Sequence, residues 1–589
     1  MPGLILTKAL ADELPPGEDC AVLARQAAEP IRTLIDCEWT EHLRARGLCI
    51  ADCMPKARRS AIHVWMDERL AVMLEGYLVH HGECHDSNDA RIVAQTYQAR
   101  GTAGVEELDG SFVIVVVERQ RGKVMLWTDR VASRPCFRGA GRGVILVAPE
   151  LKCFHLLPGL NRKLVPGSLA AMAMNGALMA EHTYYRDVQL IGPARRVTLT
   201  NTGVEIKQYW QRTFRSVAMP PSPTEVADCI GQAVRRHLTR FECPILALSG
   251  GLDSRIVLAA CQQQGLKPAA ITWGYDQIDT PGSDFQVGQA AGRLAGLEPR
   301  LRWIDVEQLP DYAERVVLLT DGLTGHLGNY PEGDALGREL AVNHDALIRG
   351  DEMFGWAAAV DSPRMALRRV GLNVGKRLRL LSFLLRRDVA EGVLEDYRRQ
   401  QMELLESSDA QADPNDLKDV LYWRTRFPRL IASQAAVFRP HIEVVCPLLD
   451  NRVLELVGRL NPAQRVNKSY IAQCTRQVFQ TQFALELNVI HSRTSWRRRL
   501  RELGPVPRYL VETLLEPQAR FDDWFDRTAI RAWLAAATAE GGHLPWPSGG
   551  TWLRRLGARA RSLALRPTFK ERVLLNLVTL KLWLKQVNN

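Results

Sequence analysis

The sequence predicts two domains: an α+β domain rich in strands, then an α/β domain with a parallel sheet and many helices. Three observations support this class. The chain has 589 residues, more than one hydrophobic core usually serves. Runs of Val, Leu and Ile divided by polar turns fill its first half, whereas strand and helix patterns alternate in the second. The proline-rich stretch MPPSPTEV, from Met219, separates the halves, so we predict domains over residues 1–215 and 222–589.

Two apolar segments of the first half predict strands. RLAVMLEGYLV spans residues 69–79, and GSFVIVVVERQRGKVMLWTD spans residues 110–129. The second segment carries the polar sequence Gln120–Lys123 at its centre, which predicts a hairpin turn.

The second half begins with buried strands. CPILALS, from Cys243, and PAAITWGY, from Pro268, are short apolar runs, each followed by a helical pattern, which is typical of a parallel sheet. Beyond about residue 360 the periodicity is almost entirely helical. GGHLPWPSGG, from Gly541, predicts a loop within this helical region.

Composition excludes several classes of protein. The formal charge is +10, but the basic residues are spread through amphipathic segments, so we expect a solvated basic surface and no nucleic-acid site. None of the 12 cysteines forms a CxxC pair with zinc spacing, which favours reduced thiols in a cytoplasmic protein. The first residues lack a secretion signal, and no apolar run is long enough to span a bilayer.

The stretch SGGLDS, Ser249–Ser254, ends an apolar strand and precedes a helix. In such a turn, glycines let the backbone approach an anion, and free N–H groups at the helix N-terminus attract it. A carboxylate would repel phosphate, so Asp253 is expected to hold Mg²⁺ against the phosphates. A polar turn without function remains the alternative, although the order strand, SGGLDS, helix is specific.

SGGLDS resembles the pyrophosphate loop of the ATP pyrophosphatases, and the chain is similar to the asparagine synthetase family within that group. LIRGDEMFGW resembles the second acidic motif of the family, and RVNKSYI resembles the segment with its catalytic lysine, here Lys468. IEVVCPLLD keeps Glu443, Pro447, Leu449 and Asp450 of a third motif. ELDGSF and the hairpin after it look like the glutaminase domain of the family.

The resemblance implies a fold, cofactors and site residues. It implies an N-terminal degenerate class II glutamine amidotransferase-like sandwich of the Ntn type and a C-terminal adenine-nucleotide α-hydrolase-like domain, with ATP and Mg²⁺. Asp253 and Asp351 would hold the metal, Lys468 would stabilise the acyl-adenylate, and Glu443 would orient or deprotonate the amine. The expected ATP and pyrophosphate residues are Leu248, Ser249, Gly250, Gly251, Leu252, Asp253, Ser254, Trp273 and Gly350. Trp273 alone would also fit a core position.

Departures from the family pattern bear on the nitrogen source. The glutaminase of this family uses an N-terminal cysteine, whereas Met1 is followed here by Pro2 and the first cysteine is Cys20. Glu75 stands where the family has the asparagine of its oxyanion hole, and a carboxylate would repel the oxyanion. We therefore expect no glutamine hydrolysis.

Two further departures concern the acceptor. Ile348 occupies the position at which the family has a glutamate and β-lactam synthetases a tyrosine, and Val445 replaces an arginine. An enzyme that adenylates a carboxylate without ammonia can use an amine of the substrate itself.

These departures favour a lasso peptide cyclase, which joins the N-terminal amine of a core peptide to an Asp or Glu side chain as a macrolactam. The resemblance implies a precursor peptide substrate, with a leader-binding protein and a leader peptidase as partners. The alternatives are a glutamine- or ammonia-dependent asparagine synthetase, a β-lactam synthetase-like enzyme, or a non-catalytic binding protein on the same scaffold.

Overall fold

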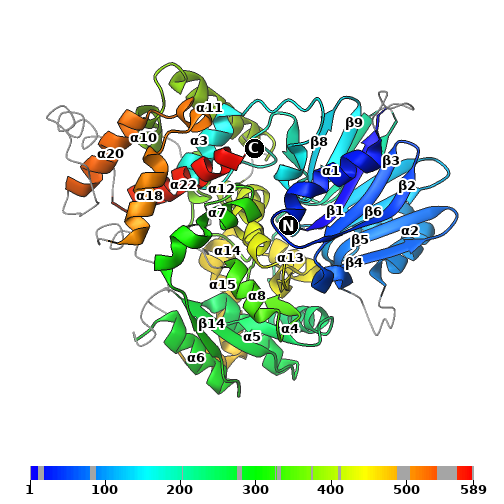
Figure 1. The fold of residues 1–589 in the computed structure, drawn as a ribbon. Coiled ribbons are helices and arrows are strands. Elements are labelled where there is room, and N and C mark those ends of the chain that lie inside the picture. The colour runs from blue at the N-terminus through cyan, green and yellow to red at the C-terminus, as the bar shows by residue number, and fades with distance from the viewer. Residues whose placement is uncertain are drawn as a thin grey trace.

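The fold is described from a computed structural model (Figure 1). It describes residues 2–10, 19–79, 88–201, 203–274, 281–325, 327, 333–372, 376–408, 413–486, 504–539 and 567–586. The loop predicted at residues 541–550 lies outside these ranges.

The N-terminal part contains two six-stranded antiparallel sheets. The first has the order β10 (Val188–Leu190), β8 (Phe137–Gly141), β9 (Val144–Ala148), β1 (Gly3–Ala9), β3 (Leu48–Met54), β2 (Glu38–Ala45). The second has the order β12 (Gly203–Gln208), β11 (Arg195–Thr200), β7 (Lys123–Thr128), β6 (Gly110–Glu118), β5 (Leu70–Leu78), β4 (Ile62–Met66). Glu118 pairs with Lys123, so β6 and β7 form the predicted hairpin.

These sheets pack face to face between two helices. Alternate residues of β6, such as Val113 and Val115, enter the core between the sheets, whereas Ile114 and Val116 pack under α2 (Asp89–Glu106). On the opposite side, α1 (Cys20–Arg32) covers the first sheet. Both faces of β6 are buried, which explains why its sequence is apolar without alternation.

The C-terminal part is built on a parallel five-stranded sheet. Its order is β15 (Arg300–Trp303), β14 (Ala269–Gly274), β13 (Pro244–Ala247), β16 (Ala346–Ile348), β17 (Glu443–Val445). The strands that follow β13 in the chain lie on both sides of it, so the strand order reverses at β13. Such a reversal leaves a crevice at the carboxyl ends of neighbouring strands, where α/β proteins bind ligands.

Helices make up most of the remaining fold. Helices in the region of the parallel sheet include α4 (Pro223–Leu238), α5 (Leu252–Gln263), α6 (Asp284–Leu294), α7 (Leu309–Leu319), α8 (Gly333–Leu340), α13 (Asn451–Gly458), α14 (Pro462–Arg465), α15 (Ser469–Val478) and α16 (Gln480–Phe483). The others are α3 (Pro166–Asn175), α9 (Pro363–Arg369), α10 (Lys376–Leu384), α11 (Ala390–Glu406), α12 (Pro414–Leu421), α18 (Pro505–Leu515), α19 (Ala519–Asp522), α20 (Arg527–Ala539) and α22 (Pro567–Gln586). A π-helix spans Tyr422–Ile431.

The two parts of the chain are joined through their helices. The last helix, α22, lies against α3 of the N-terminal part (Figure 1). Asn576 donates its side-chain N–H to the carbonyl of Ala173 at 3.2 Å, and Trp583 stacks on Tyr184 with 4.0 Å between ring centroids.

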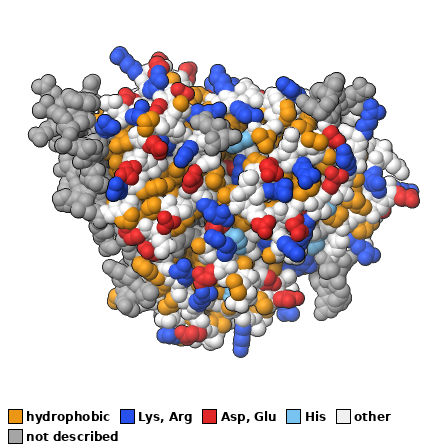
Figure 2. Space-filling view, in the orientation of Figure 1, with side chains coloured by type: hydrophobic (Ala, Val, Ile, Leu, Met, Phe, Trp, Pro, Cys, Tyr) orange, Lys and Arg blue, Asp and Glu red, His pale blue; other side chains and the backbone are white. Residues whose placement is uncertain are grey.

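On the face drawn in Figure 2, basic and acidic side chains are interspersed. Within the described ranges, no helix combines the length and the apolar character needed to cross a membrane.

Candidate active site

The SGGLDS loop connects β13 to α5 at the centre of the parallel sheet. Two hydrogen bonds between its serines close the turn. The Ser254 hydroxyl donates to the carbonyl of Ser249 at 3.0 Å and accepts from the Ser249 N–H at 3.1 Å. Gly251 precedes α5, and no described side chain caps this helix start. The uncapped N–H groups and the helix dipole suit an anionic group such as phosphate.

Lys468 and two carboxylates converge beside this loop. The Lys468 Nζ lies 2.6 Å from Asp253 Oδ2 and 2.7 Å from Glu352 Oε1. These residues come from three distant segments: the start of α5, the turn after β16 and the turn before α15. The structure thus brings Asp253 and Lys468, which the sequence singled out, together with Glu352.

Gly350 permits this close approach. A Cβ atom at Gly350 would lie 2.8 Å from the backbone N of Ser254 and 2.9 Å from the carbonyl carbon of Asp253. Any side chain would therefore push the turn after β16 away from the loop after β13. Gly350 is required by packing between the two turns.

Asp351 is held by a second group of residues at the same sheet edge. Arg349 reaches both of its carboxylate oxygens, with Nε 3.2 Å from Oδ2 and Nη2 3.3 Å from Oδ1. The Cys446 thiol donates to Oδ2 at 3.6 Å. The carboxylate expected to hold a metal is thus paired with a guanidinium in this structure.

The electrostatics of the cluster follow from burial and neighbouring charge. Burial, together with the Glu352 charge, raises the pKa of Asp253 to about 6. Burial lowers the pKa of Lys468, but the charges of Glu352 and Asp253 outweigh burial and raise that pKa overall. Lys468 is therefore a permanent cation, suited to stabilising negative charge and unsuited to accepting a proton.

The carboxylates fit a magnesium ion that is delivered with a nucleotide. Asp253 Oδ1 is buried and has no hydrogen-bond partner among the described residues, so a cation could take it. Across the described part of the chain, no three His, Cys, Asp or Glu side chains are arranged as a complete metal centre. Mg²⁺ is often held by one or two carboxylates plus substrate phosphates, so Asp253 and Asp351 suffice for such an ion.

Two of the expected nucleotide contacts lie in strand and core packing. Leu248 has a buried side chain, its N–H donates to Ile271 at 2.8 Å and its carbonyl accepts from Thr272 Oγ1 at 2.6 Å. Trp273, on β14, is half-buried and contacts Phe438 with 6.4 Å between ring centroids. Trp273 thus keeps a partly open face at the carboxyl end of β14, whereas Leu248 does not.

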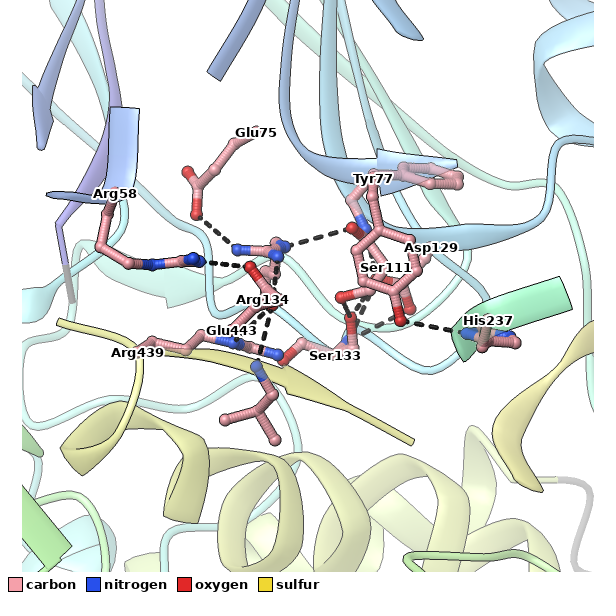
Figure 3. A network of polar contacts seen from close by, with 12 residues as sticks. Arg58, Glu75, Tyr77, Ser111, Asp129, Ser133, Arg134, His237, Arg439 and Glu443 are labelled. Atoms are coloured by element: carbon pink, nitrogen blue, oxygen red, sulfur yellow. Dashed lines mark hydrogen bonds and ion pairs between the residues drawn. The ribbon is translucent and has the colours of Figure 1, made fainter. Parts of the chain in front are cut away.

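Glu443 lies at the end of the parallel sheet opposite to Asp351. It pairs with Ala346 at the amino end of β17, whereas Asp351 follows the carboxyl end of the neighbouring strand. Its carboxylate contacts three arginines, Arg58, Arg134 and Arg439 (Figure 3). Burial raises its pKa, but these guanidinium charges outweigh burial and lower the pKa well below the usual range. This placement does not suit the expected role as the base that deprotonates an amine.

Glu75 fills the position expected for an oxyanion hole. Its Oε2 accepts the backbone N–H of Leu4 at 3.0 Å, and its Oε1 lies 3.5 Å from Arg134 Nη1. A Cβ atom at Gly3 would come within 2.4 Å of Glu75 Oε2. A buried ion pair therefore lies beside the start of β1, where the resemblance predicts an oxyanion hole.

The apolar replacements at the acceptor side are buried. Ile348 belongs to the core that packs under α5, and Val445 contacts Tyr77 and Val79 of the N-terminal part. Both side chains therefore belong to apolar packing.

Sequence reasoning missed two residues of the site. Glu352 is the second half of an Asp-Glu pair, a signal that was present in the sequence. Arg349 carries no pattern of its own and is identified only by its contact with Asp351.

Two family models match the chain. One, described as a glutamine amidotransferase domain, matches residues 73–210, and one described as asparagine synthase matches residues 225–553. The N-terminal sandwich is thus an Ntn-type amidotransferase fold, and the parallel sheet with its helices is the synthetase fold.

Individual proteins are similar over shorter stretches. The glutamine-hydrolyzing asparagine synthetase 2 of Bacillus subtilis is 22% identical over 215 residues, 32% of this chain and 29% of that protein. Amidase chyE of Penicillium rubens is 25% identical over 193 residues, 31% of this chain and 28% of that protein. The glutamine-hydrolyzing asparagine synthetase of Brassica oleracea is 25% identical over 224 residues, 35% of this chain and 33% of that protein. The chain spans a third or less of each of these relatives.

The fold was also compared with a solved structure, that of glutamine phosphoribosylpyrophosphate amidotransferase from B. subtilis complexed with ADP and GMP. The match covers 51% of this chain and 81% of the amidotransferase chain, with 10% sequence identity and a TM-score of 0.26. So weak a likeness carries no argument. The asparagine synthase model, in contrast, matches more than half of the chain. The protein belongs to the asparagine synthase family.

Proposed function

We propose that the protein is an ATP-dependent carbon–nitrogen ligase that releases AMP and pyrophosphate. One observation carries this proposal: Asp253, Glu352 and Lys468 meet beside a glycine-rich loop that leads from β13 into the uncapped start of α5, at the carboxyl edge of the parallel sheet. A substrate carboxylate oxygen would attack the α-phosphorus of ATP, and the bond to pyrophosphate would break. An amine would then attack the acyl carbon, and AMP would leave.

The residues present can support both steps. The loop Ser249–Ser254 would receive the β- and γ-phosphates at the start of α5. Asp253 and Asp351 would hold Mg²⁺, which neutralises phosphate charge when it is bound. Lys468 would leave the carboxylates that it now contacts and stabilise negative charge on the acyl-adenylate.

A second, finer candidate is a lasso peptide cyclase. The buried pair of Glu75 and Arg134 favours it, because a carboxylate at this position would repel the oxyanion that forms when glutamine is hydrolysed. A ligase without its own ammonia source can use an amine that the substrate already carries. Closing a macrolactam within one folded peptide would also make the second step intramolecular, which raises the rate.

Mass spectrometry can separate these functions. The protein is incubated with Mg-ATP and a candidate core peptide, with Asp253→Ala as control. A peptide that loses one water while AMP appears, in the wild type only, supports the cyclase. Asparagine and AMP formed from aspartate and ammonium support a synthetase instead. If no acceptor yields AMP, the ligase proposal is wrong.

A further inference from the structure

Arg349 is a buried cation at the candidate active site with no assigned role. It follows β16, and its backbone N–H donates to the carbonyl of Val445 at 2.8 Å. Only 8% of the residue is exposed. Its position is fixed by the sheet, so only the guanidinium can change partners.

The guanidinium contacts both a carboxylate and an amide. It makes the two-point contact with Asp351 described above, and its Nη2 also donates to Gln434 Oε1 at 2.6 Å. Gln434 is itself buried, so it can hold one edge of the guanidinium while the other edge exchanges partners.

The charges of the site indicate why such an exchange would matter. Two cations of the site are each paired with a carboxylate that a metal would need: Lys468 with Asp253, and Arg349 with Asp351. A metal that takes Asp351 would remove the carboxylate partner Asp351 from a buried guanidinium, and breaking a buried ion pair is costly. A substrate carboxylate in the same place would replace that partner.

We propose that Arg349 competes with a metal for Asp351 by pairing with it in the ligand-free protein, and that Arg349 binds the substrate carboxylate once a metal takes Asp351. The planar fork of donors that now contacts Asp351 at two points matches any carboxylate in the same way. Arg349 is thus a specificity residue for the carboxylate that is to be activated. This inference rests on the proposed ligase function for its substrate half, but the metal half stands on the ion pair alone.

The metal half is tested with Mn²⁺ alone, by electron paramagnetic resonance of the free ion. Arg349→Met removes the competitor for Asp351, so we expect about tenfold tighter Mn²⁺ binding, as for loss of one charge-assisted hydrogen bond. Arg349→Lys, which keeps the charge but loses the two-point contact, should lie between. Arg459→Met is the matched control, since Arg459 pairs with Glu225 at the surface.

The carboxylate half is tested with glutarate, by calorimetry in the presence of Mg²⁺ and α,β-methylene ATP. We expect Arg349→Met to weaken glutarate binding at least about tenfold, while Arg459→Met leaves it unchanged. The signature is therefore opposite: the metal binds more tightly and the carboxylate more weakly.

Two results would overturn the inference. If Arg349→Met and Arg349→Lys weaken both ligands together, Arg349 only supports the fold. If the wild type does not bind glutarate, the carboxylate half is wrong. A third result would separate this inference from the proposed function. If Arg349→Met binds Mn²⁺ more tightly as expected but no carboxylate yields AMP, the pairing of Arg349 with Asp351 in competition with a metal is supported and the proposed ligase function is wrong.

Discussion

Replacing Glu443 by Gln should destabilise the protein strongly, because Glu443 holds the two parts of the chain together. The residue is 2% exposed and lies on β17, while Arg58 and Arg134 belong to the N-terminal part (Figure 3). Glutamine keeps the shape of the side chain but removes the charge. The change therefore tests the ion pairs with little change in packing.

The magnitude follows from the charges of the network. Two carboxylates, Glu75 and Glu443, face the guanidinium groups of Arg58, Arg134 and Arg439. Glu443→Gln raises the net charge of this buried group from +1 to +2. Breaking a buried ion pair by removing one partner typically costs about 3–5 kcal/mol.

A surface pair of similar length provides the control. Glu443 Oε1 lies 2.6 Å from Arg134, and Glu225 Oε1 lies 2.7 Å from Arg459, but the second pair is nearly half exposed. In urea unfolding followed by tryptophan fluorescence, we expect Glu443→Gln to lower the free energy of unfolding by about 3–5 kcal/mol and Glu225→Gln by about 0–1 kcal/mol. Equal losses in the two variants would refute the reasoning.

The same variant has a predictable pH dependence. The pKa of Glu443 lies below its ordinary value of 4.5 in the folded protein. Its stabilising effect is therefore fully present above pH 4.5 and is lost as the pH falls toward the folded pKa. The difference between wild type and Glu443→Gln should stay constant above that pH and shrink below it.

Three other changes address the candidate active site. Lys468→Met should leave Mg-ATP binding measurable by calorimetry but slow AMP formation about 10²–10³-fold, since one charge that stabilises the reacting groups is lost; an unchanged rate would exclude the role. Mn²⁺ affinity should fall as the pH drops through about 6, because the pKa of Asp253 is raised to about 6 and its protonated carboxyl no longer binds the metal. In Asp253→Asn the Mn²⁺ affinity should no longer depend on pH in this range. Gly350→Ala should lower the melting temperature, because its Cβ would lie 2.8 Å from the backbone of Ser254, whereas Gly392→Ala on α11 meets no atom within 4 Å and should not.

Local patterns made much of the fold predictable. The run of valines in β6 and the hairpin after it can be predicted from a few consecutive residues. The SGGLDS loop between β13 and α5 can be predicted in the same way. By contrast, β17 has three residues, which is too short to show any periodicity within a helical region.

Contacts between distant residues could not be predicted in this way. Arg58 and Arg134 meet Glu443 across 385 and 309 residues of sequence, so of its three arginine partners only Arg439 lies near it in the chain. The expected base role came from the motif alone. Likewise, the role proposed for Arg349 depends on its contacts with Asp351 and Gln434, and only the folded protein brings Gln434 close to it.

The fate of an isotope tests the central claim, amide formation through an acyl-adenylate, most directly. The candidate peptide, or aspartate with ammonium, is labelled with ¹⁸O in its reacting carboxylate and incubated with the protein and Mg-ATP. If the carboxylate attacks the α-phosphorus, one ¹⁸O must appear in AMP. Formation of unlabelled AMP, or of ADP and phosphate in its place, would contradict the account.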